Sequence, residues 1–159
     1  MEEGKLSKKD IKIVIAAHKP YRMPEDTMYV PLHVGAEGKK NPDGTPLDLG
    51  YQKDNEGDNI SAKNPYYCEL TGIYYAWKNI PAEYLGLVHY RRYFKGKNKS
   101  KDPFACIVTE QEMEKIFETH RIVVPKKRKY YIETLYSHYA HTHYAEHLDC
   151  VREIIGEQC

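Results

Sequence analysis

Short apolar runs that alternate with a helical pattern constrain the fold of this chain most. Residues 11–17 (IKIVIAA) and 84–89 (YLGLVH) are nearly continuous apolar runs. Such runs are typical of strands buried on both faces, which occur in parallel sheets. Between them, four apolar residues recur at the spacing of one helix face: Leu70, Ile73, Tyr74 and Trp77. The order strand, helix, strand predicts an α/β domain with a largely parallel sheet.

The residues around the helical stripe predict its limits. Asn64 can cap a helix, and Pro65 is tolerated at the first helical position because an N–H would have no partner there. Pro81 follows shortly after the last apolar position of the stripe. We therefore expect one helix from Pro65 to Asn79.

Further elements follow the second apolar run. Thr109 and Glu112 have the spacing of a capping box, which predicts a helix directly after them. The run 122–125 (IVVP) is apolar and rich in β-branched residues, so we expect another strand there. From Thr134 onward apolar residues recur at helical spacing, which predicts helix to the end of the chain.

The segment 21–61 is rich in proline, glycine and charge. It predicts mostly loop, with one short strand over 28–34. Loops of this length in a compact domain are often binding segments or mobile, so this segment is a candidate for a functional role. Near its end, Asp58 and Asn59 have short polar side chains that can close a turn or hold a sugar or ribose hydroxyl.

Composition and charge exclude several classes of function. The 159 residues carry 24 Lys+Arg and 23 Asp+Glu, so no global charge favours nucleic acid or an anionic membrane. No apolar run approaches the roughly 20 residues of a membrane span, and residues 1–10 (MEEGKLSKKD) form a polar leader unlike a secretory signal. We expect residues 11–159 to form a single cytoplasmic domain without a transmembrane segment. The four cysteines are scattered, which predicts free thiols.

Basic or imidazole side chains follow each of three expected strands: His18 and Lys19, then His89, Arg91 and Arg92, then Lys126, Lys127 and Arg128. Because a parallel sheet binds ligands at the carboxyl ends of its strands, we expect a basic mouth there that suits a phosphate or diphosphate. Arg91 and Arg92 are the first candidates, since a guanidinium can donate two parallel hydrogen bonds. Alternatively, one arginine only forms a salt bridge or lies over a tyrosine, because successive strand residues point to opposite faces.

Residues 137–147 hold four of the eight histidines. On a helix His143 and His147 share one face and His138 and His141 share another, so we do not expect a metal site built from all four. The sequence contains no H-E-x-x-H, P-loop, G-x-G-x-x-G or G-x-S-x-G motif. Their absence excludes the common zinc-peptidase, triphosphatase, dinucleotide-binding and serine-hydrolase interpretations.

Four long segments resemble a known family, in the family's order: 16–21 (AAHKPY), 49–79 (LGYQKDNEGDNISAKNPYYCELTGIYYAWKN), 84–94 (YLGLVHYRRYF) and 125–144 (PKKRKYYIETLYSHYAHTHY). They resemble the bacterial domain family of capsular and exopolysaccharide glycosyltransferases, over nearly the whole chain. The resemblance implies a glycosyltransferase-A-like (Rossmann-like) three-layer sandwich. It also implies transfer of a sugar from a nucleotide sugar, first of all a UDP-sugar, to a growing capsular, exopolysaccharide or lipopolysaccharide acceptor, either a saccharide or a lipid-linked saccharide.

Together, the resemblance and the basic strand ends predict the residues of the site. We expect nucleotide-sugar binding by residues at the strand ends and in the long loop: His18, Lys19, Asp58, Asn59, His89, Arg91 and Arg92. Candidates for the catalytic base are Glu133 and His138, in the segment after the third basic cluster. Glycosyltransferase-A enzymes place a metal-binding Asp-x-Asp after a hydrophobic strand, but here that position reads His89-Tyr90-Arg91. We therefore predict metal-free charge neutralisation by arginine and leave a divalent metal from other residues open.

Family members continue beyond the position that matches Gly156, so the resemblance implies that the C-terminal part of the family domain is missing here. It also implies a cytoplasmic location, with a peripheral position at the inner face of the membrane as the other option. The alternative function is a non-catalytic nucleotide- or carbohydrate-binding remnant, since the 15 tyrosines suit stacking on sugars. Nucleic-acid binding by 126–131 (KKRKYY) ranks third, and the balanced charge argues against it.

Overall fold

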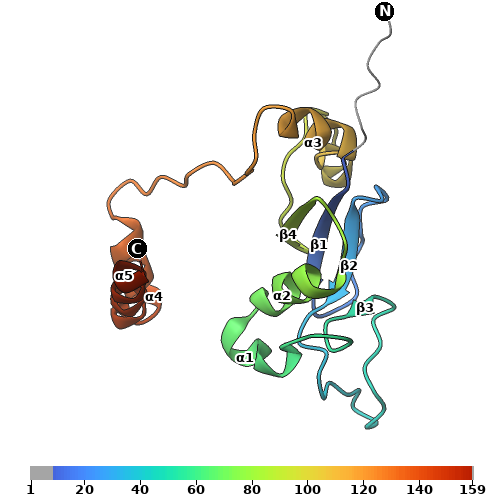
Figure 1. The fold of residues 1–159 in the computed structure, drawn as a ribbon, viewed down its shortest axis with the longest axis horizontal. Coiled ribbons are helices and arrows are strands. Elements are labelled where there is room, and N and C mark those ends of the chain that lie inside the picture. Colours follow the sequence, from blue (N-terminus) through green and yellow to red (C-terminus); the bar gives the residue numbers. More distant parts are fainter. Residues whose placement is uncertain (1–8, 159) are drawn as a thin grey trace, which may run out of the picture. The chain divides into compact units, whose positions relative to one another are not determined.

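The computed structural model describes residues 9–158 and divides the chain into two compact units, with the boundary between Val123 and Val124. The first unit holds a sheet with its covering helices, and the second holds α4 (Leu135–Thr142) and α5 (Ala145–Gln158) (Figure 1). A single domain over 11–159 stays a prediction. Most of the expected polar leader lies outside the described residues.

The sheet of the first unit has four strands in the order β3-β2-β1-β4. They are β1 (Ile11–Ala17), β2 (Tyr29–His33), β3 (Gln52–Lys53) and β4 (Tyr84–His89). Every pairing is parallel, and Ile13 of β1 lies between Tyr29 of β2 and Gly86 of β4. The predicted α/β class with a parallel sheet is confirmed, and so are the strands expected from the first two apolar runs.

The side chains of β1 alternate between two hydrophobic cores, one on each face of the sheet. Ile11, Ile13 and Ile15 pack in the core that includes Met113 of α3 (Glu110–Phe117). Val14 and Ala16 pack in the core that includes Tyr75 and Ala76 of α2 (Leu70–Asn79). Because both faces of β1 are covered, its sequence is apolar at successive positions. The sheet is thus the middle of three layers, as predicted.

The expected helix over 65–79 is interrupted. It consists of α1 (Asn64–Tyr67) and α2, separated at Cys68, whose φ of 47° no right-handed helix can contain. Asn64 is not the cap but the first residue of α1, and its side-chain amide donates to the Cys68 carbonyl at 2.7 Å and to Thr71 Oγ1 at 3.1 Å. The asparagine therefore bridges the break between the two helices.

The apolar stripe of α2 is not the face that the helix buries. Thr71, Gly72, Tyr75 and Ala76 are buried, whereas Leu70 is 56% and Trp77 65% exposed. A Cβ atom on Gly72 would lie 2.8 Å from Val34 Cγ1, so the helix approaches the sheet more closely than any larger residue permits. Close backbone approach thus determines which side of α2 faces the sheet.

The strand expected at 122–125 is absent, and that prediction is wrong. Ile122 and Val124 are exposed, and no strand in residues 9–158 pairs with the outer edge of β4. An apolar run becomes a strand only where a neighbour pairs with its backbone groups, and this run has none. Lys126, Lys127 and Arg128 consequently do not follow a strand, and they belong to the second unit.

The predicted capping box is confirmed at the start of α3. Thr109 Oγ1 accepts from the Glu112 N–H at 3.3 Å, and Glu112 Oε2 accepts from the Thr109 N–H at 3.0 Å. The predicted C-terminal helix begins after Thr134 and is divided into α4 and α5 near His143. None of the described helices has the length and apolar character needed to cross a membrane.

Candidate functional site

The carboxyl ends of β1 and β4 lie side by side, since Ala16 and His89 are partners in register. The His18 ring meets the Tyr90 ring edge-on with centroids 5.2 Å apart, and lies 6.2 Å from the His89 ring. Tyr90 is buried and forms the floor of the group. We call His18, Lys19, His89, Tyr90 and Arg91 the edge cluster. Four of its members are predicted site residues, and Tyr90 is new.

Two cations lie against Tyr90. Lys19 Nζ is 5.7 Å and Arg91 Cζ is 5.2 Å from the centre of its ring, within the range of cation–π attraction. Arg91 thus does lie over a tyrosine, as the alternative interpretation held. Both cations are exposed, and among the described carboxylates none forms an ion pair with either. Their charges are therefore available to an anionic ligand.

Arg92 is exposed next to the edge cluster, and its backbone N–H donates to the His89 carbonyl at 2.8 Å. This bond closes the chain into a tight turn directly after β4. The side chain of Arg92 therefore starts from a fixed backbone. That arrangement fits the role in binding a diphosphate which the sequence predicts for both arginines.

His89 does not add a positive charge at neutral pH. Burial lowers its pKa, Glu69 at 3.9 Å from Nε2 opposes that shift, and Arg91 reinforces it. Nδ1 accepts a hydrogen bond from the Arg91 N–H at 3.3 Å, which fits a neutral imidazole with its proton on Nε2. His89 therefore orients the backbone of Arg91, and the cationic charge comes from the arginines and Lys19.

A pocket of about 420 Å³ lies beside Arg91. Its walls come from the chain after β1, the chain after β4, and the 3-10 helix η2 (Pro103–Cys106). Five aromatic side chains line it: Tyr21, Tyr90, Tyr93, Phe94 and Phe104. Lys95 adds a second cation to the lining. Flat aromatic walls beside cations suit a ring-shaped ligand that carries negative charge, such as a sugar or base attached to phosphate.

Tyr51 stabilises one wall of this pocket, and Tyr93 contributes a neutral hydroxyl to it. The Tyr51 hydroxyl donates to the Tyr21 carbonyl at 2.9 Å and accepts from the Tyr21 N–H at 3.0 Å, which fixes the chain after β1. Burial raises the pKa of Tyr93 to about 12, so its hydroxyl stays protonated at neutral pH. The pocket therefore keeps neutral hydroxyls beside its cations.

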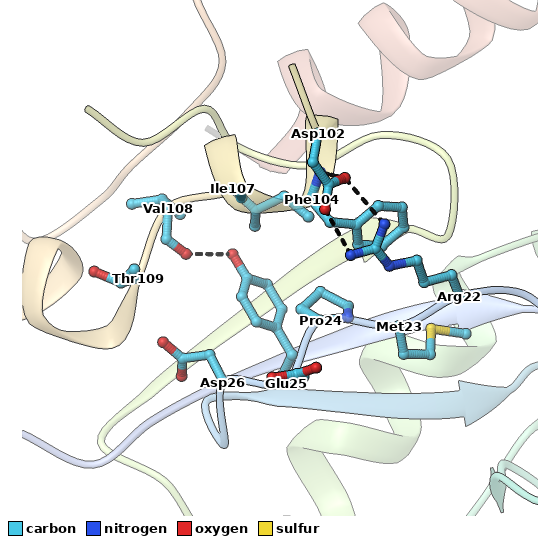
Figure 2. A pocket seen from close by; sticks show the side chains of 12 residues that line it. Arg22, Met23, Pro24, Glu25, Asp26, Asp102, Phe104, Ile107, Val108 and Thr109 are labelled. Atoms are coloured by element: carbon cyan, nitrogen blue, oxygen red, sulfur yellow. Dashed lines mark hydrogen bonds and ion pairs between the residues drawn. The ribbon is translucent and has the colours of Figure 1, made fainter. Parts of the chain in front are cut away.

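An ion pair supports Phe104, which also lines a second pocket of about 290 Å³ (Figure 2). The Arg22 guanidinium donates to both carboxylate oxygens of Asp102, at 3.0 and 2.7 Å, and lies 4.4 Å from the Phe104 ring. Asp102 also accepts from the Phe104 N–H at 3.0 Å. This clamp fixes η2 against the chain after β1. Arg22 and Asp102 are thus paired with each other, and their clamp stabilises Phe104, which lines both pockets.

Asp54 is completely buried and holds the loops beside the sheet edge. Its oxygens accept hydrogen bonds from the Gly35 N–H at 2.8 Å, the Ala36 N–H at 3.0 Å, Thr71 Oγ1 at 2.7 Å and Ser61 Oγ. The carboxylate thus ties the turn after β2 to the start of α2. Asp54 was not predicted from the sequence, because its donors lie 7 to 19 residues away and form no recognisable spacing.

His33 at the end of β2 was not predicted either. It is buried, and burial lowers its pKa. Within the described chain its Nδ1 has no hydrogen-bond partner. His33 lies one strand further along the sheet edge than Ala17, its partner in β1. A buried imidazole in this environment is neutral at neutral pH.

Asp58 and Asn59 form hydrogen bonds and an ion pair with residues outside the edge cluster. Asn59 closes a turn, since Nδ2 donates to the Gly57 carbonyl at 2.9 Å and Oδ1 accepts from the Ser61 N–H at 3.1 Å. Asp58 accepts from the Tyr74 hydroxyl at 3.1 Å and lies 3.9 Å from Lys78 Nζ. These contacts favour the turn interpretation, and a role in donor binding stays a prediction.

Glu133 and His138, the predicted catalytic candidates, form a pair in the second unit. Glu133 Oε1 lies 2.6 Å from His138 Nδ1, and this bond lowers the pKa of Glu133. The other oxygen lies 3.1 Å from Nδ1 of His141, which was not among the predicted site residues. Tyr130 stacks on His138 with ring centroids 4.4 Å apart. Within residues 9–158 no group of three His, Cys, Asp or Glu side chains is arranged to hold a metal ion.

Comparisons with known proteins identify the family of the chain. It is similar to the apo structure of the bifunctional glycosyltransferase WbbM, at 40% identity over 59% of this chain and 16% of that one, with a TM-score of 0.49. The chain thus spans less than two thirds of the solved protein. No curated protein matches it significantly. A family model described as "Domain of unknown function (DUF4422)" matches residues 12–159, nearly the whole chain, and the chain therefore belongs to the DUF4422 family.

Proposed function

We propose that this chain is the donor-binding part of a glycosyltransferase. It binds a nucleotide sugar, first of all a UDP-sugar, whose sugar passes to a saccharide or lipid-linked saccharide acceptor of a capsular polysaccharide, exopolysaccharide or lipopolysaccharide. One observation carries this proposal: Arg91 and Lys19 lie at the carboxyl edge of a parallel sheet, beside a pocket with aromatic walls, and no described carboxylate forms an ion pair with either. WbbM is a glycosyltransferase by name, but the support for the proposal comes from the site itself.

The transfer needs positive charge at the leaving group. The bond from the anomeric carbon to the diphosphate oxygen breaks, the acceptor oxygen bonds to that carbon, and the departing diphosphate gains negative charge. Arg91 and Arg92 supply charge at that point, since guanidinium donors stabilise phosphate oxygens in pairs. No carboxylate pair follows β4 in the sequence, so arginine takes the place of a metal in this proposal. His18, Lys19 and His89 surround the same position.

We assign removal of the acceptor proton to the pair of Glu133 and His138. Glu133 accepts from Nδ1 and so holds the imidazole in the tautomer whose Nε2 can take a proton. Asp58 and Asn59 are proposed to lie near the donor, where they can hold a sugar or ribose hydroxyl. The proposed location is the cytoplasm, peripheral to the inner face of the membrane, where a lipid-linked acceptor is accessible.

The test measures affinity for UDP and a panel of UDP-sugars by calorimetry, with the melting temperature of each variant as the check of folding. Arg91→Ala should weaken binding at least tenfold, since a hydrogen bond to a charged group contributes about 1.5–3 kcal/mol. Arg91→Ala/Arg92→Ala should weaken it further, and Arg91→Lys should restore it only in part. Arg121→Ala removes the same charge from another exposed position and should leave affinity unchanged.

Two outcomes would contradict the proposal. A folded Arg91→Ala/Arg92→Ala variant with unchanged affinity would remove the diphosphate site from this edge. A tenfold loss of affinity on adding EDTA, reversed by Mn²⁺ or Mg²⁺, would show that a metal ion and not the arginines neutralises the diphosphate. Binding without sugar transfer to any acceptor would instead favour the non-catalytic remnant, for which the aromatic pocket is equally suited.

A further inference from the structure

The second unit begins with a run of exposed cations. Lys126, Lys127, Arg128 and Lys129 follow one another, and all four side chains are exposed. No acidic residue occurs between positions 119 and 132. The nearest carboxylate, Glu133, is paired with His138 and His141. The positive charge of this run is therefore not neutralised by its neighbours.

Exposed apolar side chains lie on both sides of these cations. Val124 precedes them, and Tyr131, Ile132 and Leu135 follow. Tyr131 and Ile132 are fully exposed to solvent. Transfer of such exposed apolar side chains from water into an apolar phase is favourable in free energy. A run of cations with exposed apolar side chains on both sides thus occupies one short segment.

We propose that residues 124–135 dock on the surface of an anionic phospholipid bilayer. The lysines and the arginine pair with the headgroup phosphates, while Tyr131, Ile132 and Leu135 enter the boundary between headgroups and acyl chains. Clusters of four to eight Lys or Arg are the usual size for such binding, and each cation strengthens it about fivefold. The chain's net charge of +1 does not oppose this, because surface attraction acts within about one Debye length.

A bilayer fits this segment better than a nucleic acid does. Single-stranded nucleic acids bind to cations combined with free aromatic faces. Here one face of Tyr130 is already covered by His138, and much of the exposed apolar surface is aliphatic, on Val124, Ile132 and Leu135. The helix α5 carries four acidic residues, which would be repelled by an anionic surface: Glu146, Asp149, Glu153 and Glu157. The docking segment is therefore confined to 124–135.

The experiment measures co-sedimentation of the full chain with vesicles of phosphatidylglycerol mixed with phosphatidylcholine, and with phosphatidylcholine alone. The chain should bind only the anionic vesicles, and salt should weaken binding. The triple variant K126Q/K127Q/K129Q should lose roughly 100-fold in partitioning. The matched control K97Q/K99Q/K101Q removes the same charge from exposed lysines of the first unit and should bind as the unaltered chain does.

A second variant, Tyr131→Ser/Ile132→Ser, separates the two candidate partners. It should lose at least tenfold in vesicle binding with all cations in place, because insertion needs the apolar side chains. Equal loss in the control triple variant, equal binding to phosphatidylcholine, or no binding to anionic vesicles would overturn the inference. So would tight binding to single-stranded DNA that this variant leaves unchanged. This inference deepens the peripheral location given under the proposed function. The segment shares no residue with the edge cluster, and neither variant alters Glu133. Vesicle binding and UDP-sugar binding are therefore separate measurements, and either proposal can fail without the other.

Discussion

The two units bury their apolar side chains to very different extents. In the first unit β1 is covered on both faces, and Ile13, Val14 and Ile15 are almost inaccessible to solvent. In the second unit no described side chain reaches the same burial, and Leu135 and Ile155 are mostly exposed. Both units nevertheless have regular apolar patterns in the sequence. An apolar pattern therefore specifies the type of element, whereas burial requires a second element that packs on it.

The polar groups of the two units differ in the same way. Asp54 in the first unit is buried and accepts hydrogen bonds from four donors. Glu133 in the second unit accepts from two histidines near the surface. If a buried carboxylate is removed, water cannot reach its donors to replace the lost hydrogen bonds. If an exposed carboxylate is removed, water can replace them. The same carboxylate chemistry should therefore stabilise the first unit much more than the second.

Removing Asp54 is the strongest test of this contrast. Asp54→Ala leaves two backbone N–H groups and two hydroxyls without their acceptor, so we expect a loss of about 4 kcal/mol or more in the free energy of unfolding. Urea unfolding followed by circular dichroism measures it. The exposed Asp48→Ala and the surface Glu133→Gln should each cost less than about 1 kcal/mol. If Glu133→Gln costs as much as Asp54→Ala, the contrast between the units is wrong.

A smaller effect should distinguish the two faces of α2. Gly72→Ala places a methyl group against Val34, so we expect a loss of about 1–3 kcal/mol in stability. Trp77→Ser removes a much larger side chain from the exposed face and should change stability by about 0.5 kcal/mol at most. Thermal unfolding of both variants decides the matter. The reverse order would mean that the apolar stripe of α2 is the packed face.

The smallest effect concerns the histidines. Burial lowers the pKa of His33, so the unfolded chain binds its proton more readily than the folded one. Stability should therefore be constant above about pH 6.5 and decrease as the pH falls below it, by at most about 1.4 kcal/mol per pH unit for this group. His33→Gln should flatten that dependence between pH 7.5 and about pH 5. His143→Gln, at an exposed position of the second unit, should leave the slope unchanged.

Much of the candidate site was predictable because strand ends are local features. The apolar runs ending before His18 and at His89 predict where the two strands stop, and parallel pairing brings those ends together. Tyr90 was not predicted, because its role depends on the rings and cations that meet it from the chain after β1. The ion pair of Arg22 and Asp102 could not be predicted from the sequence either, since 80 residues separate its members.

The sequence by itself determined the strands over 11–17 and 84–89 with helix between them, the capping box of α3, and the basic character of the ends of β1 and β4. These features follow from contacts within a few residues, where spacing and side-chain type are sufficient. Only the tertiary structure decided that 122–125 stays outside the sheet, that α2 packs through Gly72, and that Asp54 collects its donors. The physical reason is that burial and hydrogen-bond satisfaction depend on which distant segments approach, and no local pattern encodes that approach.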